Sequence, residues 1–207
     1  MVLLRSILPL TAAIGFLLAP LVGFSENRPR PHALPYVGGR LLVAAPTMPD
    51  PRFAGTVIYM VDHTANGALG VIINRPLGVG PLDKLIKGFG IDPGQAEGDV
   101  VLHYGGPVDS TGLFVLHSSD WREPDAPPPG GPIAMTATPG IFRAIAGGGG
   151  PMLRLVLVGY AGWGPGQLEH EMAREDWLSA PADPDFVFDD DDATKWERAF
   201  ALAGVTL

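Results

Sequence analysis

A pair of β-branched and aromatic runs joined by a tight turn constrains this chain most. Residues 56–63 (TVIYMVDH) and 68–74 (ALGVIIN) flank the tetrapeptide Thr-Ala-Asn-Gly at positions 64–67. Asn-Gly supplies the positive φ angles that a tight hairpin turn requires, and the flanking runs have the composition of strands. We therefore predict an antiparallel hairpin over residues 56–74.

Shorter apolar runs between turn residues predict the other strands and helices. The further strands are expected at residues 40–45, 100–104, 113–117, 153–160 and 183–188. The helices are expected at residues 82–89, 167–177 and 193–202, and a further helix is expected to start at Thr138–Pro139 and to close at Gly147–Gly150. Because strands are grouped early and helices are interspersed later, we expect an α+β fold with a largely antiparallel sheet.

The length and the longest irregular segment indicate one domain. Residues 120–132 carry five prolines and two glycines, so we expect an exposed loop there. Too little chain follows this loop for an independent second core. A hydrophobic content of 46% and four tryptophans indicate a packed interior despite the many glycines and prolines.

The first 25 residues differ from the rest of the chain. Residues 7–24 are apolar, are interrupted by Pro9 and Pro20, and follow a single charge at Arg5. This pattern predicts a signal peptide or membrane anchor over residues 1–25, a Pro-rich tether over 26–38 and a single domain over 39–207. Such a protein is exported, to the periplasm or to the inner membrane as a tethered domain, and its N-terminal segment contacts the membrane or the export machinery. A misassigned start site, in a cytoplasmic protein, is the alternative.

The composition excludes several functional classes. The chain has 22 acidic and 14 basic residues, a net charge of -8 and three lysines, so no nucleic-acid partner is expected. It has no cysteine and therefore no disulfide, zinc ribbon or thiol nucleophile. The five histidines are scattered singly, and we expect neither a metal nor a cofactor.

Three groups of polar residues are candidate sites of chemistry. His63 lies at the hairpin, where a hydrogen-bonded turn residue is favoured over a general base. The four successive carboxylates Asp189–Asp192 cannot converge on one ion and more often form a solvated helix start. Glu171 and Glu175 share one face of the predicted helix and are expected on its exposed surface.

The glycine-rich turn from Gly162 to Gln167 has an unusual composition. A strand, the pattern G-x-G-x-G and a helix start follow one another, which exposes backbone N–H groups that could hold an anion. The favoured interpretation is structural: the glycines let the loop pass tightly under Trp163. The tryptophans are expected to be core or helix anchors.

Three segments of this sequence resemble the signature blocks of the AlgH/YqgE family of uncharacterised bacterial proteins: residues 41–77, 104–117 and 159–168. The match covers about residues 39–206. The resemblance implies an α+β fold in which a bifurcated sheet includes a small closed β-barrel, surrounded by helices. It implies no established activity and no catalytic residues. The family-like positions are Pro46, Asp50, Phe53, His63, Gly67, Gly70, Asn74, Pro76, Gly105, Gly106, Pro107, His117, Gly162, Trp163, Gly164, Gly166, Gln167 and Trp177.

These observations favour a non-enzymatic binding or regulatory domain, whose partner is an unknown protein or a small anionic ligand. One alternative is a small-molecule or anion-dependent enzyme that uses His63 and the turn at residues 162–167. A transcriptional regulator is a further alternative, which the acidic charge disfavours. The candidate binding surface consists of Asp50, Phe53, His63, Asn74, Trp163, Gly164, Gly166 and Gln167.

Overall fold

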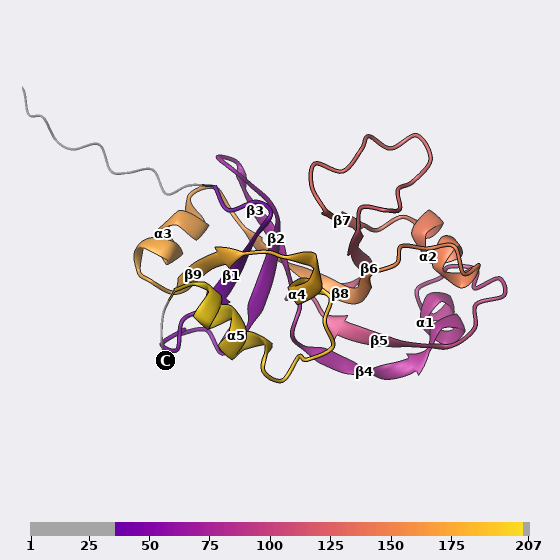
Figure 1. The fold of residues 1–207 in the computed structure, drawn as a ribbon, viewed down its shortest axis with the longest axis horizontal. Helices are drawn as coiled ribbons and strands as arrows, with labels where there is room; N and C mark the ends of the chain where they lie inside the picture. The colour runs from indigo at the N-terminus through magenta and orange to yellow at the C-terminus, as the bar shows by residue number, and fades with distance from the viewer. Residues whose placement is uncertain (1–35, 205–207) are drawn as a thin grey trace, which may run out of the picture. The chain divides into compact units, whose positions relative to one another are not determined.

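A computed structural model describes residues 36–204 (Figure 1). The predicted leader, residues 1–25, and most of the predicted tether lie outside the described residues. No helix within residues 36–204 has both the length and the apolar character needed to cross a membrane.

The described part forms one branched, nine-stranded sheet with five helices. Its strands are β1 (Arg40–Ala44), β2 (Val57–Thr64), β3 (Gly67–Ile72), β4 (Pro76–Pro81), β5 (Asp99–Tyr104), β6 (Val108–Ser118), β7 (Ile133–Thr136), β8 (Arg154–Trp163) and β9 (Trp177–Pro181). Its helices are α1 (Leu82–Gly88), α2 (Pro139–Ala146), α3 (Gln167–Ala173), α4 (Pro184–Val187) and α5 (Lys195–Leu202).

The strand order is β4-β5-β8-β3-β2-β1-β9, and β6 pairs with both β8 and β7. Each pairing within residues 36–204 is antiparallel except β5 with β8. The α+β class and the largely antiparallel sheet are therefore confirmed. The family resemblance also implied a small closed barrel, and this expectation is wrong. The described sheet stays open, with β4 and β9 at its two ends.

Strand β8 is the branch point of the sheet. Its first half, Leu155–Val158, pairs with β6 and β5, whereas Ala161–Trp163 pairs with β3. Gly159 lies between the halves with φ 73°, a left-handed conformation that glycine adopts without a steric penalty. The strand can thus change partners without ending.

A glycine pair after β5 packs against this branch point. The Gly105 N–H donates to Val158 O at 2.8 Å, and Gly105 O accepts from the Ile72 N–H at 2.9 Å, so this residue joins β8 to β3. A Cβ at Gly105 would lie 2.2 Å from Gly159 O, and one at Gly106 would lie 2.2 Å from the Tyr160 carbonyl carbon. Three backbones therefore approach more closely than any side chain would allow.

The hairpin and most other predicted elements are confirmed, but the region after α3 differs. The predicted helix at residues 167–177 ends at Ala173, because Glu175 adopts φ 62°, and Trp177 begins β9 instead. The strand predicted at 183–188 is wrong. That segment contains the helix α4, whose Asp183 side chain accepts a hydrogen bond from the Asp185 N–H at 2.9 Å and whose first turn holds Pro184.

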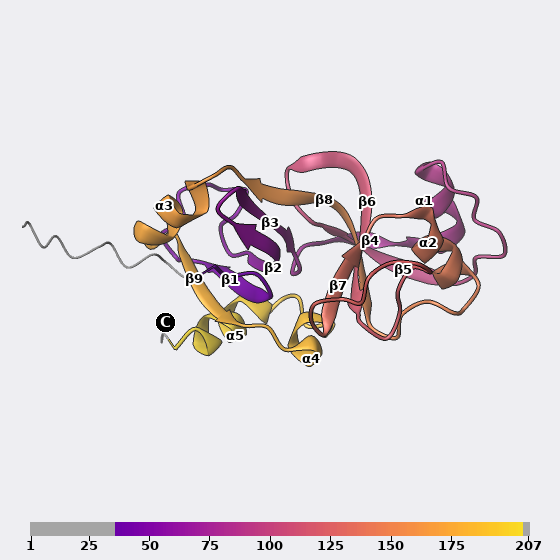
Figure 2. The same cartoon turned by 90° about the horizontal axis from the view of Figure 1, so that it is seen from above.

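Both faces of the central strands are buried. Leu41 and Val43 of β1 pack with Phe200 of α5 on one face, whereas Leu42 and Ala44 pack in a second cluster on the other. A third cluster unites α1 and α2 with β6 and β8, and these two helices lie side by side in both views (Figures 1 and 2). Burial on both faces explains why the strands have nearly continuous apolar sequences.

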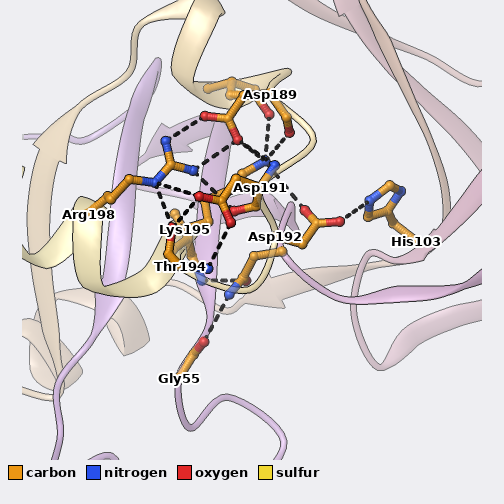
Figure 3. A network of polar contacts seen from close by, with 11 residues as sticks. Gly55, His103, Asp189, Asp191, Asp192, Thr194, Lys195 and Arg198 are labelled. Atoms are coloured by element: carbon orange, nitrogen blue, oxygen red, sulfur yellow. Dashed lines mark hydrogen bonds and ion pairs between the residues drawn. The ribbon is translucent and has the colours of Figure 1, made fainter.

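A network of charged side chains around the buried Lys195 joins the C-terminal segment to the sheet through His103 (Figure 3). Lys195 has no exposed surface, donates to Asp189 O at 2.8 Å, and lies 3.4 Å from a carboxylate oxygen of both Asp189 and Asp192. Asp192 in turn contacts His103 Nε2 of β5 at 3.2 Å, and Arg198 pairs with Asp189 at 2.7 Å. Three of the four carboxylates in the predicted solvated acidic run, those of Asp189, Asp191 and Asp192, thus belong to an ion-pair network.

His117 of β6 is a neutral, buried histidine. Its Nδ1–H donates to Ser118 O at 2.8 Å, and its Nε2 accepts from the Thr136 hydroxyl at 3.0 Å. Burial lowers the pKa of His117 below its ordinary value of 6.5, although the Ser118 carbonyl and the Asp120 charge act in the opposite direction.

We predict that the unfolding free energy falls as the pH drops below about 6.5. His117 then becomes protonated in the unfolded chain but stays neutral in the folded protein, where its pKa is lower. One such group contributes a slope of at most about 1.4 kcal/mol per pH unit. Urea unfolding at about pH 7.5 and about pH 5.5 measures it. The loss should shrink in His117→Gln and persist in the exposed-site control His170→Gln; an undiminished loss in His117→Gln contradicts the assignment.

Candidate functional site

A cavity of about 450 Å³ lies between the loop that follows β1, the start of β6, the end of β8 and helix α3. Its lining combines aromatic rings with charged and amide side chains. It is formed by Met48, Pro49, Asp50, Arg52, Phe53, Pro107, Val108, Gly162, Trp163, Gln167, Glu171, Arg174, Asp176 and Trp177.

Three aromatic rings form one wall of the cavity. Phe53 stacks on Trp163 with ring centroids 6.5 Å apart, and it meets Trp177 edge-on at 5.6 Å. The two indoles are T-shaped to each other at 6.1 Å. Both tryptophans are buried, as the sequence predicted for core anchors, whereas Phe53 is half-buried.

One carboxylate fixes the two indoles. Glu171 Oε2 accepts from the Trp163 Nε1–H at 2.8 Å and from the Trp177 Nε1–H at 2.9 Å. Its other oxygen accepts from the Gln167 amide at 3.0 Å. The sequence placed Glu171 on an exposed helix face, and this is wrong because β9 folds back beside α3 and brings Trp177 to the same carboxylate.

Ion pairs and hydrogen bonds of Arg52 and Arg75 hold the loop that carries Phe53. Asp50 and Arg52 form a two-pronged ion pair, with the shortest contact at 2.6 Å, and this hydrogen bonding lowers the pKa of Asp50. Arg75 donates to Arg52 O at 2.6 Å and to Ala54 O at 2.8 Å. The aromatic ring of Phe53 therefore sits on a positioned loop.

Asn74 also supports this loop. Its amide donates to Gly55 O at 3.0 Å, while its Oδ1 accepts from the Val57 N–H at 2.8 Å. Asn74 thus joins the end of β3 to the start of β2 and lies outside the cavity lining.

Two backbone N–H groups of the glycine-rich turn donate hydrogen bonds within the turn itself. The Gly164 N–H donates to the Gln167 side chain, and the Gln167 N–H donates to Gly164 O, both at 3.1 Å. Gly166 has φ 74°, which positions the start of α3. The two inward bonds support the structural interpretation of the turn over an anion cradle.

His63 is buried and fully hydrogen-bonded at a different place. Its Nδ1 accepts from the Val37 N–H at 3.1 Å, so its Nε2 carries the proton and donates to Glu169 at 3.2 Å. The Tyr36 ring covers it edge-on at 5.0 Å. One ring nitrogen thus binds the segment before β1 and the other binds α3, and His63 is not part of the cavity lining.

The structure thus brings together four of the predicted surface residues, Asp50, Phe53, Trp163 and Gln167, in one cavity. Gly164 and Gly166 shape the adjoining turn, whereas Asn74 and His63 act elsewhere. Within residues 36–204, no three His, Asp or Glu side chains converge as metal ligands would.

Comparison with known proteins identifies the family. A family model described as AlgH-like matches residues 41–207. The chain belongs to this AlgH-like family. A UPF0301 protein of Methylococcus capsulatus is 44% identical over 82% of this chain and 92% of its own length, and one of Rhodospirillum rubrum is 43% identical over 82% and 88%.

Solved structures agree with the AlgH-like fold. The solution structure of AlgH from Pseudomonas aeruginosa superposes with a TM-score of 0.70, at 38% identity, over 83% of this chain and 90% of that one. A Corynebacterium diphtheriae protein, at 24% identity and a TM-score of 0.56, shares the fold alone. The names of these relatives state no function.

We predict that Glu171→Ala lowers the unfolding free energy by about 2 kcal/mol or more, because two buried indole N–H groups lose their acceptor. Urea unfolding measures this loss, and tryptophan fluorescence reports the changed indole environment. Glu197→Ala, at an exposed position of α5, is the matched control and should change stability little. Equal stability of Glu171→Ala and Glu197→Ala contradicts the role given to the carboxylate.

Proposed function

We propose that this AlgH-like domain is a non-enzymatic binding module, and that the cavity beside α3 holds a segment of a protein partner. The observation that carries the proposal is the preformed aromatic wall of Phe53, Trp163 and Trp177, fixed by Glu171. Preformed apolar walls with a few positioned polar groups are typical of binding sites, because little ordering is required when the ligand enters.

Two exposed arginines of the cavity lining offer polar contacts. The side chains of Arg52 and Arg174 are 61% and 60% exposed, and each is paired with an aspartate two residues away. Each guanidinium has further N–H groups that can donate to backbone carbonyls or a carboxylate of the bound segment. We therefore expect an apolar side chain of the partner against the aromatic wall, with polar groups beside it.

The contacts of the charged lining favour binding over proton transfer. Glu171 already accepts three hydrogen bonds, and Asp50 and Asp176 are each paired with an arginine. These carboxylates hold the walls in place. The enzyme alternative rested on His63 and the N–H groups of the turn, which are engaged in other hydrogen bonds.

The compartment of the partner follows from the leader. Because residues 1–25 have the pattern of a signal peptide or anchor, we infer that the partner is an envelope protein. A cytoplasmic partner is the alternative, and extracts of both compartments belong in the test.

We predict that Gly162→Leu abolishes partner capture by filling the cavity. A Cβ at Gly162 would meet Tyr160 at 3.4 Å and Val108 at 3.9 Å, so the substitution fits the backbone while its side chain occupies the space. The measurement is affinity capture from envelope and cytosolic extracts with wild type, Gly162→Leu and the control Gly131→Leu, which lies in the open loop.

Wild type and Gly131→Leu should recover the same envelope protein, and Gly162→Leu should not, although its melting temperature is retained. Identical recovery by all three proteins means that the cavity is not the binding site. Recovery of no protein by wild type, combined with thermal stabilisation by small anions, favours the small anionic ligand instead.

A further inference from the structure

A second cavity, of about 500 Å³, lies between strand β5, the segment that leads into β8 and the loop between α4 and α5. It shares no lining residue with the cavity beside α3. Its lining within residues 36–204 carries four carboxylates and one guanidinium: Asp99, Asp189, Asp190, Asp192 and Arg154. The Arg154 guanidinium donates to Pro151 O at 2.9 Å. We call this site the acidic cavity.

Two of the four carboxylates are not engaged by other groups of residues 36–204. Asp99 and Asp190 are exposed, and neither side chain makes an ion pair or a hydrogen bond within this part of the chain. Asp189 and Asp192 differ, because a carboxylate oxygen of each lies 3.4 Å from Lys195 Nζ. The negative charges of Asp99 and Asp190 are therefore available to a positively charged ligand.

His103 lines the same cavity, and one of its ring nitrogens lacks a partner. The residue is 4% exposed, and Figure 3 shows the ring reaching from β5 to Asp192, whose Oδ2 lies 3.2 Å from Nε2. Lys195 already supplies a positive charge beside this carboxylate, so we assign the neutral ring, with the proton on Nε2 and a lone pair on Nδ1. Nδ1 is buried and has no hydrogen-bond partner within residues 36–204. Buried polar atoms are nearly always hydrogen-bonded, so the cavity is missing a donor.

Apolar side chains adjoin the carboxylates. Val101 lies on the same face of β5 as Asp99, because side chains alternate along a strand. Val101 and Leu153 are each 37% exposed, Met152 is 79% exposed, and all three line the acidic cavity. A ligand with an apolar part would remove this surface from water, which is favourable.

We propose that the acidic cavity binds a primary alkylammonium group, as a lysine side chain of a protein or as a free amine. The positive charge suits Asp99 and Asp190, and the alkyl chain suits the apolar surface beside them. The group has three N–H donors, one of which is the donor that His103 Nδ1 lacks. No residue of the aromatic wall lines this cavity, so the proposal and the proposed function can fail independently.

Calorimetric titration of the full-length protein tests the ligand class. The probe is n-hexylammonium. The comparison ligands are n-hexyltrimethylammonium, which has the charge without N–H donors, and hexan-1-ol, which has a donor without the charge. The probe should bind about tenfold or more tightly than either, because only it makes charge-assisted hydrogen bonds, and added salt should weaken its binding. Equal affinity for the three ligands, or no binding of the probe, overturns the proposal.

Removal of the two unpaired charges is a second test. The double variant Asp99→Asn, Asp190→Asn should bind n-hexylammonium about fivefold or more weakly, because each exposed ion pair contributes up to a few-fold in affinity. The matched control Asp62→Asn, Glu197→Gln removes two exposed charges outside the cavity lining and should bind as wild type does. Both double variants should keep the wild-type melting temperature. Equal affinity of the two double variants contradicts the site.

Nitrogen NMR of the imidazole rings reports the contact with His103. In the free protein, its Nδ1 should give the signal of an unprotonated nitrogen, and n-hexylammonium should shift that signal. The rings of His63 and His117, whose nitrogens already have partners, are internal controls. A protonated Nδ1, or equal shifts of all three rings, contradicts the assignment of the donor.

Nα-acetyl-lysine methylamide distinguishes the two sources of the amine. If this compound shifts His103 Nδ1 as n-hexylammonium does, the site accepts a lysine side chain of a protein. If n-hexylammonium alone shifts it, the ligand is a free amine. If neither compound shifts it, the proposal is wrong.

Discussion

The close approach of three backbone segments at Gly159 determines the arrangement of both parts of the sheet. Strand β8 passes from β5 and β6 to β3 at this residue, and Gly105 and Gly106 pack where any side chain would collide with β8. Gly105 hydrogen-bonds to β8 with its N–H and to β3 with its carbonyl. The two parts of the sheet therefore share a strand and a hydrogen-bonded junction.

The cavity depends on the same strand. The end of β8 presents Gly162 and Trp163, the glycine-rich turn reverses the chain, and α3 returns Glu171 to the Trp163 indole. Strand β9 then brings Trp177 to the same carboxylate. The aromatic wall is thus built from residues within one short strand-helix-strand unit, together with Phe53 from a loop that Asn74 and Arg75 hold. This arrangement gives the binding proposal its preformed surface.

Local signals allowed much of the fold to be predicted. The Asn-Gly turn between residues 56–63 and 68–74 specified the hairpin, because the turn and the strands it joins are adjacent in sequence. Strands β4, β7 and β9 were not predicted: β4 begins and ends with proline, and the other two are short. The family resemblance added the expectation of a closed barrel, which the open strand order corrects.

Part of the site could also be predicted, because some of its residues lie in segments with a recognisable local pattern. Trp163 and Gln167 stand in a recognisable turn, and Asp50 and Phe53 lie in a loop marked by prolines, so their residue types were conspicuous. The role of Glu171 depends on Trp177, six residues further on, lying in a strand instead of continuing the helix. His63 was conspicuous as a histidine at a turn, yet its partners Val37 and Glu169 are distant in sequence and could not be inferred from it.

Strand β8 makes the two parts of the sheet one cooperative unit on which the cavity is built. Native-state hydrogen exchange of the β8 amides is the decisive test. We expect the amides in Leu155–Val158 and in Ala161–Trp163 to open with the same free energy, equal to that of global unfolding. Two distinct opening free energies, divided at Gly159, would contradict it.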